Sequence, residues 1–153
     1  MNIQEINQQK INENKKNIFS ALSALNVEEV NASYSGYGDS GSINDITFWV
    51  KNKKTGKCDQ VSDWKKICGK IPSISINLVE NIWVSNQYET QQIEKEFEIY
   101  EAVETYLYQV LELKHPGWEI DAGSNGDFEF KVAENKINWN HCMMVEEHET
   151  STL

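Results

Sequence analysis

The chain has 153 residues, of which 39% are hydrophobic and 10% aromatic, and it carries a formal net charge of −10. This composition predicts one globular domain, 1–153, and excludes a wholly disordered chain. Residues 1–79 have a net charge of +2 and residues 80–153 a net charge of −12, and the chain contains no arginine, so we expect no direct contact with nucleic acid.

The N-terminal third of the chain predicts a helix and a β-hairpin. Apolar residues at helical spacing predict an amphipathic helix that ends near Asn26. Alternating apolar and polar residues over 28–35 and 43–50 predict two strands, joined by a turn in the glycine-rich segment 36–41. Trp49 falls opposite the apolar row of its strand, so we expect its side chain to face outward.

Lysine dominates the next segment, since residues 51–70 contain seven of the 14 lysines. We predict a short helix over 61–68, which Pro72 prevents from continuing, and a strand over 74–78.

The second half predicts a long helix followed by strands. An apolar stripe at helical spacing predicts a helix over 91–114, and His115-Pro116-Gly117 ends it. Three alternating runs then predict an antiparallel meander, at 118–122, 128–132 and 137–139, with turns at Asn125-Gly126 and Glu134-Asn135.

The predicted elements together indicate an α+β fold. We expect an antiparallel sheet of about five to six strands, built from the hairpin and the C-terminal meander, with two main helices packed on one face. We expect the acidic tail, 143–153, to fray. The sequence shows no apolar leader and no apolar run of membrane-spanning length, which favours a cytoplasmic protein with free thiols at its three cysteines.

Three short patterns are typical of ordinary turns rather than of binding sites. The G-x-G-x-x-G match at 36–41 would hold a dinucleotide only if it opened a helix, and a strand is predicted after it. The segment Asp121–Glu129 partly matches a calcium loop but lacks ligands that such a loop needs. The late histidines and cysteine lack zinc-site spacing. We therefore expect no metal, no cofactor and no catalytic residue.

A row of carboxylates is the most informative candidate site. In the predicted long helix five of them fall near one line: Glu94, Glu98, Glu101, Glu104 and Glu112. Like charges four residues apart destabilise a helix by about 0.2–0.5 kcal/mol per pair. The row is either a solvated face or a surface that binds a groove rich in lysine or arginine, and we take it as the partner-binding site, with Asp121 and Asp127 as further candidates.

Two segments resemble a family of small uncharacterised bacterial proteins found on phages, plasmids and other mobile elements. These are Ser35–Ile43 (SGYGDSGSI) and the run Tyr106–Val132, which contains YQVLELKHPGWEI and DAGSNGDFEFKV. The resemblance implies a compact α+β domain and a mobile-element setting, but no activity and no catalytic residue. Residues 51–90 depart from it and look like a possible lysine-rich insertion.

Three functional hypotheses remain open. The first is a non-enzymatic acidic protein of a mobile element that inhibits a host nuclease or nucleic-acid-binding defence factor, as an anti-CRISPR protein does. The second is an immunity protein or antitoxin that neutralises a basic toxin. The third is a small enzyme that uses the turn carboxylates Asp39, Asp121 and Asp127. The first two require a basic protein partner, and the sequence leaves the oligomeric state undecided.

Overall fold

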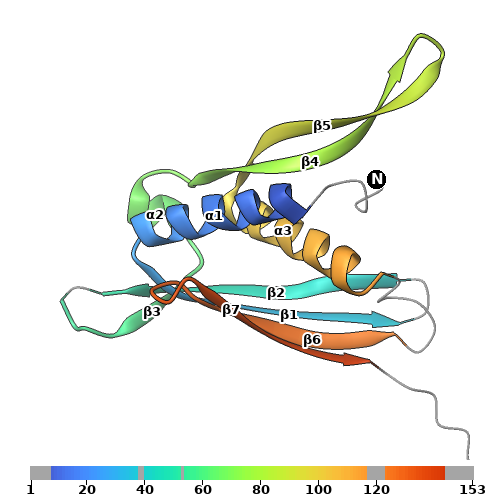
Figure 1. Ribbon diagram of the computed structural model, residues 1–153. Coiled ribbons are helices and arrows are strands. Elements are labelled where there is room, and N and C mark those ends of the chain that lie inside the picture. The colour runs from blue at the N-terminus through green and yellow to red at the C-terminus, as the bar shows by residue number, and fades with distance from the viewer. Residues whose placement is uncertain (1–7, 38–39, 53, 117–122, 144–153) are drawn as a thin grey trace, which may run out of the picture.

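The computed structural model describes residues 8–37, 40–52, 54–116 and 123–143 (Figure 1). These residues form three helices and seven strands, and the strands make two antiparallel sheets. In chain order the elements are α1 (Gln8–Ala24), β1 (Val27–Tyr37), β2 (Ser40–Lys51), β3 (Cys58–Val61), α2 (Trp64–Cys68), β4 (Ser73–Val84), β5 (Gln87–Glu98), α3 (Ile99–Lys114), β6 (Ser124–Lys131) and β7 (Lys136–Met143). The predicted α+β class is confirmed.

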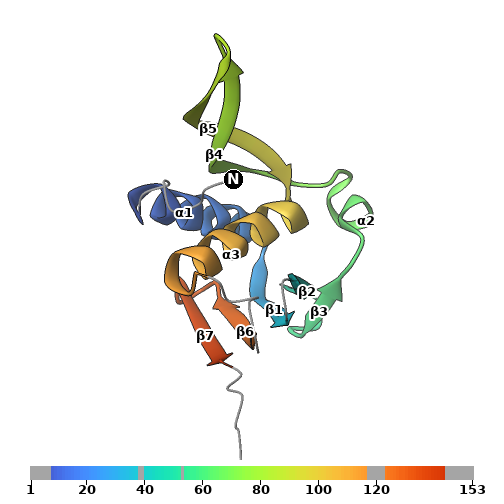
Figure 2. The same cartoon turned by 90° about the vertical axis from the view of Figure 1, so that its right-hand side faces the viewer.

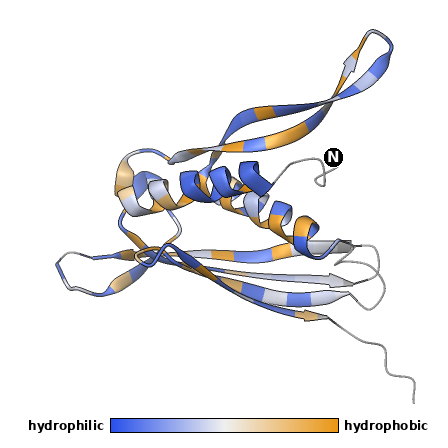
Figure 3. Cartoon of the chain, in the orientation of Figure 1, coloured by the Kyte–Doolittle hydropathy of each residue, from blue (hydrophilic) through white to orange (hydrophobic). Residues whose placement is uncertain are grey.

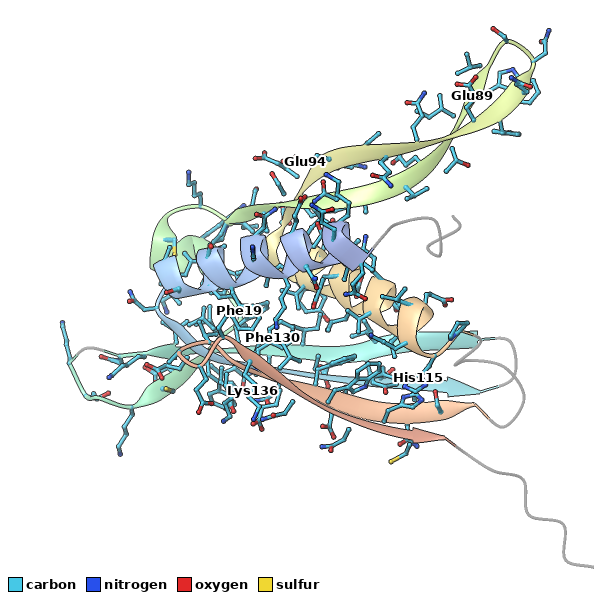
Figure 4. The ribbon with its side chains drawn as sticks, in the orientation of Figure 1. Phe19, Glu89, Glu94, His115, Phe130 and Lys136 are labelled. Carbon is cyan, nitrogen blue, oxygen red and sulfur yellow. The ribbon has the colours of Figure 1, made fainter. Side chains whose placement is uncertain are left out.

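The main sheet has five strands in the order β3-β2-β1-β6-β7. Its central strand β1 pairs on one side with β2, as the alternation predicted, and on the other side with β6. Because side chains alternate along a strand, one face of the sheet carries a buried apolar row that includes Val30, Phe48 and Phe130. Helices α1 and α3 cover this face (Figures 1 and 2), and the ring of Phe19 in α1 stacks on that of Phe130 at 5.7 Å (Figure 4).

Strands β4 and β5 form a separate two-stranded hairpin. The hairpin lies on the side of α1 and α3 opposite the main sheet, so the helices are the middle of three layers near its base, and its far end extends away from the rest (Figures 1 and 2). Three side chains of β4 seal this second interface and are buried: Ile74, Ile76 and Leu78. The β4 side of the hairpin therefore belongs to the core.

The helix predicted over 91–114 is wrong in its first part. Residues 91–98 belong to β5, and α3 begins only at Ile99. Ile93 and Phe97 are four residues apart, which fits a helix, but on β5 they lie on one face and pair in register with Leu78 and Ile74 of β4. Pairing with β4 therefore overrides the local helical pattern.

Other boundaries differ less. The short helix α2 begins at Trp64, because the Asp63 side chain accepts a hydrogen bond from the backbone N–H of Lys66 and so caps it. The turn predicted at Asn125-Gly126 is wrong, since both residues lie within β6, where Gly126 pairs with Tyr34. The predicted strand 118–122 lies outside the described residues, as does the predicted tail apart from Met143.

Candidate protein-binding surface

A cluster of side-chain amides fixes the base of the β4–β5 hairpin. The Asn14 amide of α1 accepts a hydrogen bond from the backbone N–H of Asn77 at 2.7 Å and donates to the backbone oxygen of Asn77 at 3.1 Å. Asn14 also donates to Gln109 of α3 at 2.8 Å, and Gln109 donates to the same Asn77 oxygen at 2.8 Å. Asn14 and Gln109 are 0% and 1% exposed. At the edge of β4 that faces the helices, these amides therefore make the backbone hydrogen bonds that a neighbouring strand would otherwise make.

The far end of the hairpin is exposed. Trp83 and Tyr88 face each other across the two strands, are 59% and 71% exposed, and hold their rings 4.8 Å apart in an edge-to-face geometry. The turn between the strands is Ser85-Asn86, and both residues have positive φ angles. Hydrophobic and hydrophilic bands alternate along the hairpin (Figure 3). Sequence reasoning missed this aromatic pair, because Asn86 was the only strong turn signal between the strands.

The first two candidate carboxylates lie on this hairpin. Glu94 is an exposed residue in the middle of β5 (Figure 4), and Glu98 is the exposed residue at which β5 gives way to α3. Glu96 lies between them on the same face, because side chains two residues apart on a strand point the same way. The helical interpretation missed Glu96, which a helix would have placed on another side.

The remaining helical candidates lie along α3. Glu101 is exposed in the first turn, and Glu104 is half-buried one turn later. Burial raises the pKa of Glu104, and the nearby Glu101 carboxylate raises it further. Glu112 lies near the other end of the helix, about 16 Å along the axis from Glu101. Glu94 and Glu98 thus share one face of β5, Glu101 and Glu104 lie near each other at the start of α3, and Glu112 lies apart; we call the first four the acidic run.

The lysines in the described part of the chain leave this run uncompensated. The ion pairs there join Lys10 to Glu13, and Lys131 to Glu29 and Glu129. The one lysine of β5, Lys95, lies over the ring of Phe97 instead. Within the described residues, the carboxylates at 94, 98, 101 and 104 therefore form no ion pair with a lysine.

Asp127 does not join the run. Asp127 is exposed on β6 and accepts a hydrogen bond from Asn140 of β7 at 3.1 Å, on the sheet face away from the helices. Asp39 and Asp121 lie outside the described residues.

The outer face of the main sheet carries an open depression of about 550 Å³. It is lined by Trp49, by Cys58 and by the ion pair of Lys131 with Glu29. The indole nitrogen of Trp49 is buried there without a hydrogen-bond partner in the described structure. The side chain of Trp49 lies on the outer face, as its register predicted, and is half-buried.

A cluster of rings at the end of α3 was not predicted. The rings of His115 and His141 stack at 3.7 Å, and the Tyr34 hydroxyl hydrogen-bonds Nδ1 of His141. Trp139 donates its indole N–H to the same hydroxyl at 2.9 Å. Burial lowers the pKa of His141, and the neighbouring His115 lowers it further. Tyr34 reaches His141 across Gly126, where a side chain would lie in the way, so the cluster depends on strand register and not on any local motif.

The described residues offer no group of three or more histidines, cysteines or acids that could hold a metal ion. None of the helices described is both long and apolar enough to cross a bilayer. No curated protein and no solved structure matches the chain. A family model does match, over residues 10–153, and the chain therefore belongs to this family of unknown function, DUF6878.

Proposed function

We propose that this protein is a non-enzymatic binding protein that uses the β4–β5 hairpin and the start of α3 to bind a basic protein partner. One observation carries the proposal: a projecting hairpin combines an exposed aromatic pair, Trp83 and Tyr88, with carboxylates at its base that form no ion pair with the described lysines. Large exposed aromatic residues are the usual anchors of protein interfaces.

Charge supports a basic partner. Residues 80–153 have a net charge of −12, and the hairpin strand β5 contains four glutamates and one lysine. Complementary charge across an interface accelerates encounter and makes binding weaken with salt. Since nucleic acid is itself strongly negative, the same surface favours a protein that binds nucleic acid over nucleic acid itself.

The biological setting in this proposal is a mobile element, with a host nuclease or nucleic-acid-binding defence factor as the inhibited partner. The run of carboxylates would occupy the basic groove that such a partner uses for a phosphate backbone. An immunity protein for a basic toxin would use the same surface. Gene neighbourhood separates the two, because an immunity gene lies beside its toxin gene.

Charge reversal tests the proposal. The triple variant Glu94→Lys, Glu98→Lys and Glu101→Lys should lose a partner that the wild-type protein captures from host lysate at low salt. The matched control reverses three exposed acids elsewhere, Glu28, Asp59 and Glu134, and changes the net charge by the same amount. The control should keep the partner. Retention by the first triple variant, or loss in both, would contradict the proposal.

A further inference from the structure

The turn of the β4–β5 hairpin fixes which backbone groups of β5 face outward. Ser85 and Asn86 have φ angles of 50° and 67°, which define a two-residue turn of the type I′ class. Such a turn makes Val84 and Gln87 a hydrogen-bonded pair, after which hydrogen-bonded and non-hydrogen-bonded pairs alternate.

Asn77 confirms this alternation independently. Its pair with Glu94 falls in the non-hydrogen-bonded class, so the N–H and C=O of Asn77 should point away from β5. They do, because both are bound by the amide of Asn14 in α1. The N–H and C=O of Glu94 therefore point away from β4, toward the free edge of β5.

The same pattern repeats along the whole of β5. Alternate residues direct their backbone groups to the outer edge, and among them are Tyr88, Gln92, Glu94 and Glu96. In the described structure this sheet has two strands only, so β4 occupies one edge of β5 and the other edge has no neighbouring strand. All these residues are exposed. A long exposed edge of this kind is a template for one more strand.

One face of this edge combines charge and aromatic surface. The residues with outward backbone groups also share a side-chain face, so Tyr88 and its partner Trp83 lie at the far end of that face. Three carboxylates follow at successive positions of the same face near the base, at Glu94, Glu96 and Glu98. An added strand would place every second side chain opposite these residues.

We propose that β5 binds an extended segment of the partner as a third strand, and that this segment carries lysine or arginine at every second position. The inference rests on the proposed function and specifies its mode of binding. Charge favours this occupant over a second copy of the chain, because pairing two β5 strands would bring eight carboxylates together against two lysines.

Hydrogen exchange tests the mode directly. The probe is a nine-residue peptide, Thr-Lys-Thr-Lys-Val-Lys-Thr-Lys-Thr, with blocked ends, and the control peptide has the same composition with its four lysines in one block. The alternating peptide should slow amide exchange at Gln92, Glu94 and Glu96, whereas Gln91, Ile93 and Lys95 are already protected by β4. If the peptide binds but the slowed amide exchange does not recur at every second residue of β5, strand addition is overturned and the acidic surface alone is the binding site. Equal binding of both peptides would also overturn it.

A proline substitution gives a second test. Gln92→Pro removes one outward N–H on an edge strand, where proline is tolerated. The variant should bind the alternating peptide with about tenfold lower affinity. Gln92→Ala keeps the N–H and should change affinity less than twofold. Equal affinities of the two variants would refute the proposal. Sedimentation of the free protein as a dimer that Gln92→Pro dissociates would refute it too, since the occupant would then be a second copy. If instead the charge-reversed triple variant binds the alternating peptide normally, the proposed function itself fails.

Discussion

A single substitution, Asn14→Leu, should destabilise the attachment of the β4–β5 hairpin to the helices. Leucine is close to asparagine in shape, so the change removes hydrogen bonds without opening a large cavity. Two groups are left without their partner inside the protein, the backbone N–H of Asn77 and Oε1 of Gln109. The side-chain amide of Asn77 loses its bond to Asn14 but keeps one to Glu13. The Asn77 oxygen keeps its bond from Gln109.

The magnitude follows from the number of orphaned groups. A buried polar group left without a partner costs about 1–3 kcal/mol, so Asn14→Leu should lower the free energy of unfolding by about 2–6 kcal/mol. Domains have total stabilities of about 5–15 kcal/mol, so this loss is a large fraction of the whole. Asn17→Leu is the matched control, because Asn17 donates one exposed bond to the Ser75 oxygen, and it should cost about 1 kcal/mol.

Urea denaturation followed by tryptophan fluorescence measures both variants. Adding Gln109→Leu to Asn14→Leu removes the orphaned Oε1 atom, so the double variant should lose less than the sum of the two single variants. If Asn14→Leu proves no more harmful than Asn17→Leu, or if the double variant is strictly additive, then the amide cluster does not couple the hairpin to the helices and the reasoning is refuted.

Three further predictions concern the main sheet. Gly126→Ala should lower the free energy of unfolding by about 3 kcal/mol in urea denaturation, because the new Cβ would clash with the backbone oxygen of Asn140 and with the ring of Tyr34; an unchanged stability would show that both the β7 backbone and the ring can shift. Tyr108→Phe should lower the free energy of unfolding by about 1 kcal/mol, because the Tyr108 hydroxyl accepts a hydrogen bond from the backbone N–H of Ile43 in β2. Thermal denaturation measures the loss, and an unchanged melting temperature would show that this bond does not stabilise the fold. Because burial and His115 lower the pKa of His141, the unfolded chain takes up a proton more readily than the folded one, so stability should fall as pH drops below about 6.5. Urea midpoints between pH 7.5 and 5.5 measure this slope, and His141→Asn should flatten it.

Alternation and helical spacing were sufficient to predict the elements that have a local signal. The apolar row of β1 and the stripe of α1 each repeat with the period of their own element, and both were found where expected. The fold class followed from these elements. The hairpin β4–β5 was predicted only in part, because the apolar positions of β5 are sparse and only two of them, Ile93 and Phe97, are half-buried.

The ring cluster of Tyr34, Trp139 and His141 shows a second limit of sequence reasoning. These three side chains come from β1 and β7, which are not paired strands, and they meet because β6 lies between them with a glycine at the crossing point. The sequence contains that glycine within Asn125-Gly126, where the pair is the strongest short signal for a turn. Only the register of three strands distinguishes a glycine that turns the chain from one that makes room for a ring.

The misassigned segment also changes what the candidate carboxylates can do. On a helix, Glu94 and Glu98 would present side chains alone, because the helix satisfies its own backbone groups. On the edge strand β5, Glu94 presents its carboxylate together with backbone N–H and C=O groups that no strand of the described structure pairs with. A helix surface would select a partner by charge alone. An edge strand also selects by conformation, because only an extended segment can pair with the carboxylates and with the backbone groups at the same time. The correction from helix to strand therefore narrows the expected partner from any basic groove to a basic strand.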